Sequence, residues 1–350
     1  MVRSGRSTEA RAWSHPRGYL DTATYGLPPV EAVERSRQAL EEWADGSGVW
    51  RRWNDAADEA RRLFAAFTGT AAEAVAVGPA TSTFVGLVAA SLPAGSEVVV
   101  PEGDFTSLLF PFLVQRTRGV RVRVVPLGAL ADSVRSSTTL VAWSAVQSSD
   151  GRVADAAAVL DAAHGSNALT LVDATQALGW LPLPVDRIDA TVCSAYKWLC
   201  CPRGTAFMVT SPRLLASCTP HAAGWFAADD MHAAYYGTPL RLAATARRLD
   251  VSPAWHAWIG AVASLEVLGQ IGADAMNRHN VGLADALRIA LDLEPSGSAI
   301  VSIAGADAER ALASARIKAS IRADGCRLSF HIYNDDEDVA DAVSALRPNR

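Results

Sequence analysis

The 350-residue chain lacks several features that would assign it to a class of protein at once. No run of basic residues is longer than two and the formal net charge is −5, so neither a nucleic acid nor an anionic membrane is an expected partner. No uninterrupted apolar stretch reaches the roughly 20 residues that span a bilayer. The arginines near the N-terminus are not followed by an apolar segment, so a secretory signal is not predicted. We expect a soluble, cytoplasmic protein.

Cysteine is also scarce. The chain has five cysteines, an odd number, and their spacing does not repeat. A disulfide framework and a zinc site are therefore not predicted, and no other metal is expected.

Half of the residues are apolar, which is enough to bury a core in one large domain or two smaller ones. In the central part of the chain, short runs rich in Val and Leu alternate with stretches of helical length. The predicted strands are residues 98–101, 120–125, 139–146, 169–172, 190–193 and 206–209, and the predicted helices are residues 82–92, 107–117 and 154–164. Such runs suit strands that are covered on both faces. The alternation predicts an α/β fold with a mostly parallel sheet between helices.

The flanking segments have a different pattern. Two amphipathic helices are predicted before this region and two long helices after it, and the last 50 residues alternate again between strand and helix. The flanking helices are residues 29–44, 55–67, 255–271 and 273–291, and the final elements are strands 299–303 and 327–332 with helices 306–315 and 335–346. We predict three parts: an N-terminal segment (1–45) that packs with the small domain, a large domain (46–250) and a small C-terminal α/β domain (251–350).

The most informative stretch lies at residues 171–207. An apolar strand brings Asp173 to its carboxyl end, and a second strand ends just before Tyr196 and Lys197. Open parallel sheets bind ligands at this edge, so a carboxylate and a lysine are expected there together.

Here the sequence resembles the class V aminotransferase family of fold-type I enzymes, which use pyridoxal 5′-phosphate (PLP) and include cysteine desulfurases and kynureninases. The matching motifs are DATQA at 173–177 and SAYKW at 194–198, supported by YLDTAT at 19–24 and RLSFHIYN at 327–334. The resemblance covers nearly the whole chain. It implies a large domain with a seven-stranded, mostly parallel sheet and a small C-terminal α/β domain.

The chemistry of the cofactor explains the residue types. Asp173 is predicted to keep the pyridine nitrogen protonated, since opposite charges at close range stabilise each other. Lys197 is predicted to form the Schiff base and to shuttle protons, and Gln176 matches the position that binds the phenolic oxygen. Taken alone, Asp173 could be a helix cap and Lys197 a solvated surface residue. The combination of motifs favours the cofactor.

A strand, a turn and a helix at residues 76–91 are predicted to bind the phosphate. The free amides at a helix N-terminus attract a phosphate dianion. By resemblance, Ala80 and Thr81 contact it together with Ser194, and Tyr196 adds its phenol. Helix capping by Thr81 would be compatible with either interpretation.

Two further residues are assigned to the cofactor by resemblance. Phe105 occupies the position of the aromatic side chain that stacks on the ring, although it could instead belong to the core. Either Gln147 or Ser148 occupies the position that reaches the phenolic oxygen, and we assign Ser148.

The substrate carboxylate needs a planar, permanently charged partner, and Arg327 matches that position in the family. Thr24 and Trp225 are predicted to line the substrate pocket, although Trp225 could also belong to a dimer contact. Ser252 matches a residue that reaches the phosphate of the neighbouring subunit, with residues 237–239 as the alternative. The resemblance therefore implies a homodimer with composite active sites.

Two differences from the sequences of the cysteine desulfurases limit the reactions that we expect. Tyr196 stands where they carry histidine, and the segment 315–325 contains no cysteine to act as a nucleophile. Cys326 at the start of a strand is expected to be a packed thiol. We predict a lyase that cleaves a C–S or C–C bond at Cβ of a small amino acid, through a Schiff base with the substrate and a Cα carbanion. An aminotransferase or an epimerase is the alternative, and a non-catalytic PLP-binding protein is the most distant one.

Overall fold

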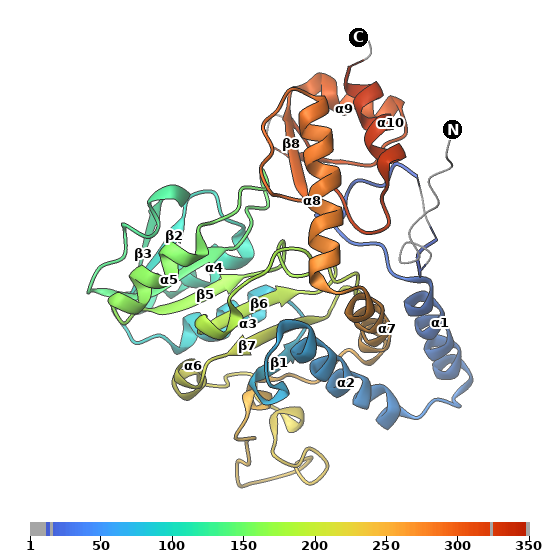
Figure 1. Cartoon of the computed structure of the whole chain (residues 1–350). Coiled ribbons are helices and arrows are strands. Elements are labelled where there is room, and N and C mark those ends of the chain that lie inside the picture. Colours follow the sequence, from blue (N-terminus) through green and yellow to red (C-terminus); the bar gives the residue numbers. More distant parts are fainter. Residues whose placement is uncertain (1–11, 15–16, 323–324, 348–350) are drawn as a thin grey trace.

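The computed structural model describes residues 12–14, 17–322 and 325–347. Residues 1–11, where the predicted N-terminal segment begins, lie outside the described residues. The largest feature is a seven-stranded sheet with the strand order β1-β7-β6-β5-β4-β2-β3 (Figure 1). Its strands are β1 (Val75–Gly78), β2 (Glu97–Pro101), β3 (Arg121–Val125), β4 (Thr138–Ser144), β5 (Leu169–Asp173), β6 (Ala190–Ser194) and β7 (Ala206–Thr210).

The pairing in this sheet is mostly parallel, as predicted. β3, β2, β4, β5 and β6 run in parallel, whereas β7 is antiparallel to both of its neighbours, β6 and β1. The carboxyl ends of β4, β5 and β6 therefore lie at one edge. This edge is where the sequence places Asp173 and Lys197.

Helices cover both faces of the sheet, because successive side chains of each buried strand point to opposite sides. In β2, for example, Val98 and Val100 pack into one core and Val99 packs into the other. One layer consists of α3 (Thr81–Ser91), α4 (Thr106–Val114) and α6 (Pro212–Ser217). The other consists of α2 (Trp50–Thr68), α5 (Ala156–Gly165) and α7 (Trp255–Ile271), with α1 (Val30–Asp45) packed on α7.

The small domain has a three-stranded antiparallel sheet with the order β8-β10-β9. Its elements are α8 (Ala273–Ala290), β8 (Ile300–Ala304), α9 (Ala306–Ser314), β9 (Ser320–Arg322), β10 (Gly325–Ser329) and α10 (Asp336–Leu346). The chain before α1 runs beside this sheet, since Tyr19 bridges to Lys318 and Asp21 bridges to Ser329. Figure 1 shows α8 rising from the end of α7 into this domain.

Most elements lie within a few residues of their predicted bounds, but two short ones, β9 and α6, are not predicted by the sequence. β9 has only three residues, including an exposed arginine, so it has no apolar run to reveal it. The domain boundaries at 45/46 and 250/251 stay a prediction. The packing of α7 against α2 and α1 favours a boundary after Ile271, at the break between α7 and α8.

Backbone groups on the outer side of β1 form hydrogen bonds with side chains instead of with another strand. Asp250 accepts the amide of Val77 (2.8 Å) and pairs with Arg61 (2.5 Å), and Arg61 also donates to the carbonyl of Val75. Both charged side chains are buried. This network holds the strand that leads into α3.

Within the described residues, no single helix has both the length and the apolar composition needed to cross a membrane. α7 and α8 meet both conditions only as a pair, and that pair is bent by 83°.

Candidate active site

A cavity opens where β4, β5 and β6 end, and the residues predicted for the cofactor gather around it. β5 delivers Asp173 and β6 delivers Ser194, and the chain after β6 brings Lys197 to the same cavity. The lining residues are Thr81, Phe105, Ser107, Ser144, Ser148, Asp173, Thr175, Gln176, Ser194, Tyr196 and Lys197. One ligand in this cavity would therefore touch the predicted lysine, carboxylate and helix N-terminus.

Lys197 is almost completely buried, with 6% of its surface exposed. Its Nζ lies 5.5 Å from the centre of the Phe105 ring and 5.8 Å from that of Tyr196, and no hydrogen bond or ion pair to Nζ is found among the described residues. Burial lowers the pKa of Lys197 to about 8, against the opposing effect of the Asp173 charge, and the positive charge of Arg327 adds to the lowering. A buried amine without a partner is costly, so this position is not explained by packing.

Asp173 is the acidic counterpart of this lysine. One of its oxygens accepts the backbone amide of Thr175 (2.9 Å). Burial raises the pKa of Asp173 to about 6, the Thr175 bonds oppose that rise, and the charge of the buried Asp104 adds to it. Asp173 is therefore ionised at neutral pH and available to a cationic group in the cavity.

Three hydroxyl groups, those of Thr81, Thr175 and Ser194, lie together at the N-terminus of α3, at one end of the cavity. No side chain from the Ncap residue, Ala80, closes this helix. The Thr81 amide donates to Ser194 Oγ (3.0 Å), and the Thr81 hydroxyl contacts both Ser194 Oγ (2.8 Å) and Thr175 Oγ1 (3.0 Å). Sequence reasoning missed Thr175, although it lies inside the DATQA motif. A helix N-terminus with three hydroxyls fits a phosphate group.

Phe105 is half exposed and lines the cavity beside Lys197. The residue before it, Asp104, was also missed. The Asp104 carboxylate accepts the amide of Phe105 (2.6 Å), the amide and hydroxyl of Ser144, and Nε2 of Gln147 (3.2 Å). It thereby ties the end of β2 to the end of β4. Its position in the short turn between the buried strand β2 and α4 was the available signal.

Gln176 and Ser148 lie next to each other and line the cavity, whereas Gln147 does not line it. Gln176 donates to the carbonyl of Ala23 (2.9 Å) and to Ser148 Oγ (3.2 Å) and accepts the indole N–H of Trp198 (2.9 Å). Gln147 turns towards Asp104. Ser148 is therefore the one of the two candidates that faces the cavity.

Arg327 is completely buried next to Ser148. Its Nη1 donates to the carbonyl of Ser148 and to Ser148 Oγ (3.1 Å), and its Nη2 donates to Thr24 Oγ1 (3.0 Å). Its Nε has no partner among the described residues. Burial lowers the pKa of Arg327 to about 10, and the positive charge of Arg322 lowers it further. The site therefore holds a buried cation with unused hydrogen-bonding capacity.

Five predicted residues are not among those that line this cavity. Ala80 directly precedes Thr81, and Arg327 and Thr24 are joined to the lining through Ser148, whereas Trp225 and Ser252 lie elsewhere in the described chain. Trp225 packs in an aromatic cluster with Trp50 and Tyr235. Ser252 is exposed and follows Asp250, which is bonded to β1. Neither is among the lining residues.

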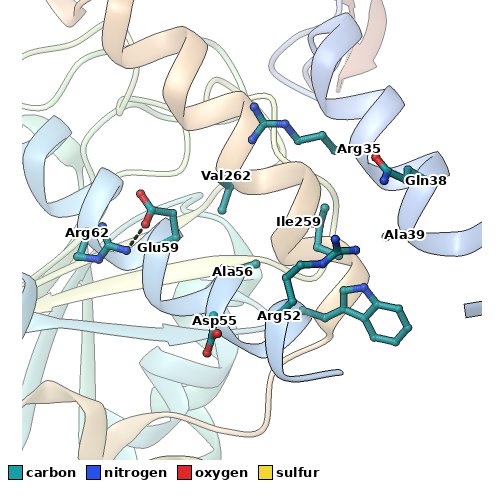
Figure 2. A pocket seen from close by; sticks show the side chains of 11 residues that line it. Arg35, Gln38, Ala39, Arg52, Asp55, Ala56, Glu59, Arg62, Ile259 and Val262 are labelled. Carbon is teal, nitrogen blue, oxygen red and sulfur yellow. Dashed lines mark hydrogen bonds and ion pairs between the residues drawn. The ribbon is translucent and has the colours of Figure 1, made fainter. Parts of the chain in front are cut away.

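A second cavity lies between α1, α2 and α7 and contains three arginines (Figure 2). Each arginine already has a carboxylate partner: Arg35 pairs with Glu31 and Glu266, Arg52 with Glu42, and Arg62 with Glu59. This cavity has no unpaired reactive group comparable to Lys197.

The fold and the cavity together define a PLP-type enzyme, and comparisons with known proteins agree. The family model described as Aminotransferase class-V matches residues 19–318. The chain belongs to this family and is a PLP-dependent enzyme. The cavity fits the cofactor, because it offers a hydroxyl-lined helix N-terminus, an ionised carboxylate and an unpaired amine.

The chain is similar to several family members of different activity. It is 27% identical to a probable cysteine desulfurase of Methanothermobacter thermautotrophicus, covering 77% of this chain and 71% of the relative. It is 28% identical to a kynureninase of Deinococcus radiodurans, covering 76% and 69%. The solved structure of a cystine C–S lyase in complex with cysteine persulfide superposes with a TM-score of 0.84 at 19% identity, covering 94% and 97%. This last likeness shows the fold.

Proposed function

We propose that this enzyme is a β-lyase that cleaves the carbon–sulfur bond at Cβ of a small amino acid. The observation that carries the proposal is the buried Lys197 amine, which lines one cavity with Asp173 and has no hydrogen-bond partner among the described residues. An amine placed in this way can form and release a covalent bond to a carbonyl compound.

Several residues would hold the cofactor. The α3 N-terminus with Ala80, Thr81, Thr175 and Ser194 would bind the phosphate, and Tyr196 would add its phenol. Asp173 would pair with the ring nitrogen. Phe105 would cover one face of the ring, and Gln176 and Ser148 would reach the phenolic oxygen. When bound, PLP supplies an electron sink for negative charge at the substrate Cα.

The chain's own groups then position the substrate and move its protons. Arg327 would bind the α-carboxylate, with Thr24 beside it. Lys197 Nζ would take the proton from Cα, and its lowered pKa of about 8 makes the neutral amine accessible near neutral pH. The Cβ–S bond breaks, the sulfur leaves as a thiol, and water completes the reaction to pyruvate and ammonia.

Transfer of sulfur to a cysteine of the protein is not supported by the cysteines present. All five are free and buried. Burial raises the pKa of Cys326, which directly precedes Arg327, and so disfavours its thiolate. Free, buried cysteines are also compatible with the reducing cytoplasm that we predict as the location.

The reaction is tested by incubating the PLP-loaded enzyme with S-substituted cysteines in the absence of a 2-oxo acid. Formation of pyruvate, ammonia and thiol in equal amounts is the expected result. A strict requirement for a 2-oxo-acid acceptor would show an aminotransferase, and loss of optical activity without pyruvate would show an epimerase. Either result would overturn the lyase.

The cofactor assignment has a separate test, since the chain contains only two lysines, Lys197 and Lys318. Borohydride reduction should fix the cofactor on the peptide that contains Lys197. The exposed Lys318 is the internal control. Label on Lys318, or on neither lysine, would contradict the role of Lys197.

We also propose a homodimer in which Ser252 or residues 237–239 reach the phosphate of the partner and Trp225 borders the substrate pocket. The exposure of Ser252, outside the cavity of its own chain, supports a contact made elsewhere. Light scattering should give twice the chain mass of 36.9 kDa. A fully active monomer would exclude a composite site.

A further inference from the structure

A second arginine lies beside the predicted carboxylate site. Arg322, at the end of β9, donates from Nη2 to Thr24 Oγ1 (3.4 Å), and its Nη1 donates to the carbonyl of Ile321 (2.6 Å). Thr24 Oγ1 also accepts Nη2 of Arg327 (3.0 Å). Two guanidinium groups therefore meet at one hydroxyl oxygen. Arg327 is buried and Arg322 is exposed, so Arg322 lies on the solvent side of the pair.

Within residues 17–322 and 325–347, the structure gives neither of these two positive charges an ion pair. Among the described residues, neither Arg322 nor Arg327 forms a salt bridge with a carboxylate. Asp21 acts on Arg327 at a distance and accepts the hydroxyl of Ser320, which also contacts Thr24. The charge of Arg322 reaches Lys197 as well, where it helps to lower the pKa. Two like charges at close range oppose each other unless an anion joins them.

A single α-carboxylate of the substrate would pair with only one of these two arginines. It would use the buried Arg327, whose Nε has no partner, and would leave the exposed Arg322 available. A guanidinium can bind a carboxylate through two parallel hydrogen bonds. We propose that Arg322 binds a second anionic group of the substrate, so that the enzyme selects amino acids whose side chain ends in a carboxylate.

This inference rests on the proposed β-lyase, in which the leaving thiol would carry the second carboxylate. The alternative is that Arg322 and Arg327 share the single α-carboxylate. These two possibilities predict different kinetics. The effect of replacing Arg322 depends on the charge of the substrate side chain only if Arg322 binds a second anion there.

The kinetic test compares S-(2-carboxyethyl)cysteine with its neutral carboxamide, which has nearly the same size. In Arg322→Gln, kcat/KM for the acid should fall by about 10- to 100-fold, the range expected for a lost hydrogen bond to a charged group, while that for the carboxamide changes less than about twofold. Arg322→Lys should keep part of the preference. Arg310→Gln removes the same charge from an exposed position on α9 and should change neither substrate.

Equal losses with both substrates would assign Arg322 to the α-carboxylate, and no loss with either would leave it without a role in binding. Both results overturn the proposal.

A binding test keeps this inference separate from the reaction. The PLP-loaded enzyme is titrated calorimetrically with glutarate, which has two carboxylates, and with glutaramate, which has one. The wild type should bind glutarate at least about tenfold more tightly, and Arg322→Gln should lose that preference. If no amino acid is cleaved but the wild type prefers glutarate to glutaramate, the proposed lyase activity is wrong and the second anion site is supported. Equal affinity for the two ligands in the wild type overturns the inference.

Discussion

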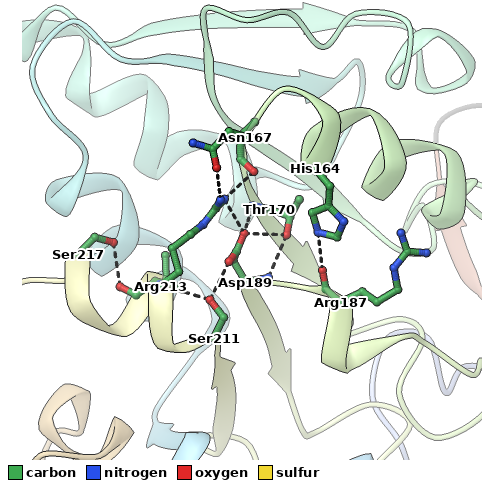
Figure 3. A network of polar contacts seen from close by, with 10 residues as sticks. His164, Asn167, Thr170, Arg187, Asp189, Ser211, Arg213 and Ser217 are labelled. Carbon is green, nitrogen blue, oxygen red and sulfur yellow. Dashed lines mark hydrogen bonds and ion pairs between the residues drawn. The ribbon is translucent and has the colours of Figure 1, made fainter.

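Two buried aspartates lie at opposite edges of the large sheet and have very different surroundings. Asp189, just before β6, is surrounded by donors (Figure 3). It accepts the amide of Thr170 (3.0 Å) and the hydroxyl of Ser211 (2.7 Å), and it pairs with Arg213 (3.2 Å). Arg213 also holds the carbonyl of Ala168 (2.7 Å). This carboxylate ties β5, β6 and the end of β7 together.

Asp173, at the other end of β5, has one backbone donor, and burial raises its pKa to about 6. No ion pair to it is found among the described residues. The carboxylate of Asp189 is satisfied by the protein, whereas that of Asp173 faces a cavity with Lys197. The edge of the sheet around Asp189, at the amino ends of β5 and β6, is therefore stabilised by the protein itself, and we call it the stabilising edge. The edge around Asp173 and Lys197, at the carboxyl ends of these strands, is completed by a ligand, and we call it the ligand edge.

The largest effect should come from Lys197→Ala at the ligand edge. Loss of both the covalent attachment and the proton carrier should lower kcat/KM for elimination by about 10⁴-fold or more. The measurement is pyruvate release, with thermal unfolding as a check on the fold. Lys318→Ala should retain full activity. An active Lys197→Ala enzyme would remove the basis of the comparison.

Neutralising each of the two aspartates should produce opposite effects on the reaction rate and on stability. Asp173→Asn should lower the rate on the order of 10²- to 10³-fold with little change in stability, since it removes a preorganised charge that the protein does not neutralise. Asp189→Asn should lower the free energy of unfolding by about 2–3 kcal/mol and leave the rate nearly unchanged, because one accepting oxygen becomes an NH2 donor and Arg213 loses its anionic partner. Pyruvate assays and urea denaturation of both variants measure the two effects. Similar results for the two variants would show that the edges do not differ as we describe.

Much of the fold and the centre of the site could be predicted because they depend on local patterns. Buried strands of the large sheet are continuous apolar runs, and a polar residue at the end of such a run points to the ligand edge. This pattern places Asp173 and Lys197 near the ligand edge, and their roles there were predicted from the DATQA and SAYKW motifs that resemble the family. Their placement in one cavity follows from parallel pairing.

Other features of the fold and of the site depend on tertiary contacts, which a local sequence pattern does not reveal. β7 is antiparallel to β6 and to β1, which lies far away in the sequence, and β9 is too short to form an apolar run. Asp104 and Thr175 act through contacts with other strands, and Arg322 matters only because β9 brings it to Thr24. The roles of Ser252 and Trp225 stay predictions, since they concern a second subunit.

The unpaired amine should also make the ligand edge a source of instability in the apoenzyme. Burial lowers the pKa of Lys197 from 10.5 to about 8, so the unfolded chain binds one more proton than the folded chain between these two values. The free energy of unfolding therefore rises with pH through this window, and the full cost of the buried charge is present below pH 8. Lys197→Met should raise the stability of the apoenzyme at pH 7 by about 1–3 kcal/mol, with the difference shrinking above pH 8. Urea denaturation from pH 7 to 10 measures it, and a less stable variant at pH 7 would contradict it.

The smallest effect contrasts two buried threonines, one at each edge. Thr81 places its hydroxyl among Ser194 and Thr175 at the free α3 N-terminus, whereas the Thr170 hydroxyl accepts the amide of Asp189 (2.9 Å). Thr81→Ala should weaken PLP binding by about tenfold, the lower end of the range for one hydrogen bond to a charged group, and leave the apoenzyme almost as stable as before. Thr170→Val should lower the free energy of unfolding by about 1 kcal/mol without changing PLP affinity. Fluorescence titration with PLP and urea denaturation test both variants. If Thr170→Val weakened PLP binding as much as Thr81→Ala, the two edges would be coupled, and the division of the sheet into a stabilising edge and a ligand edge would not hold.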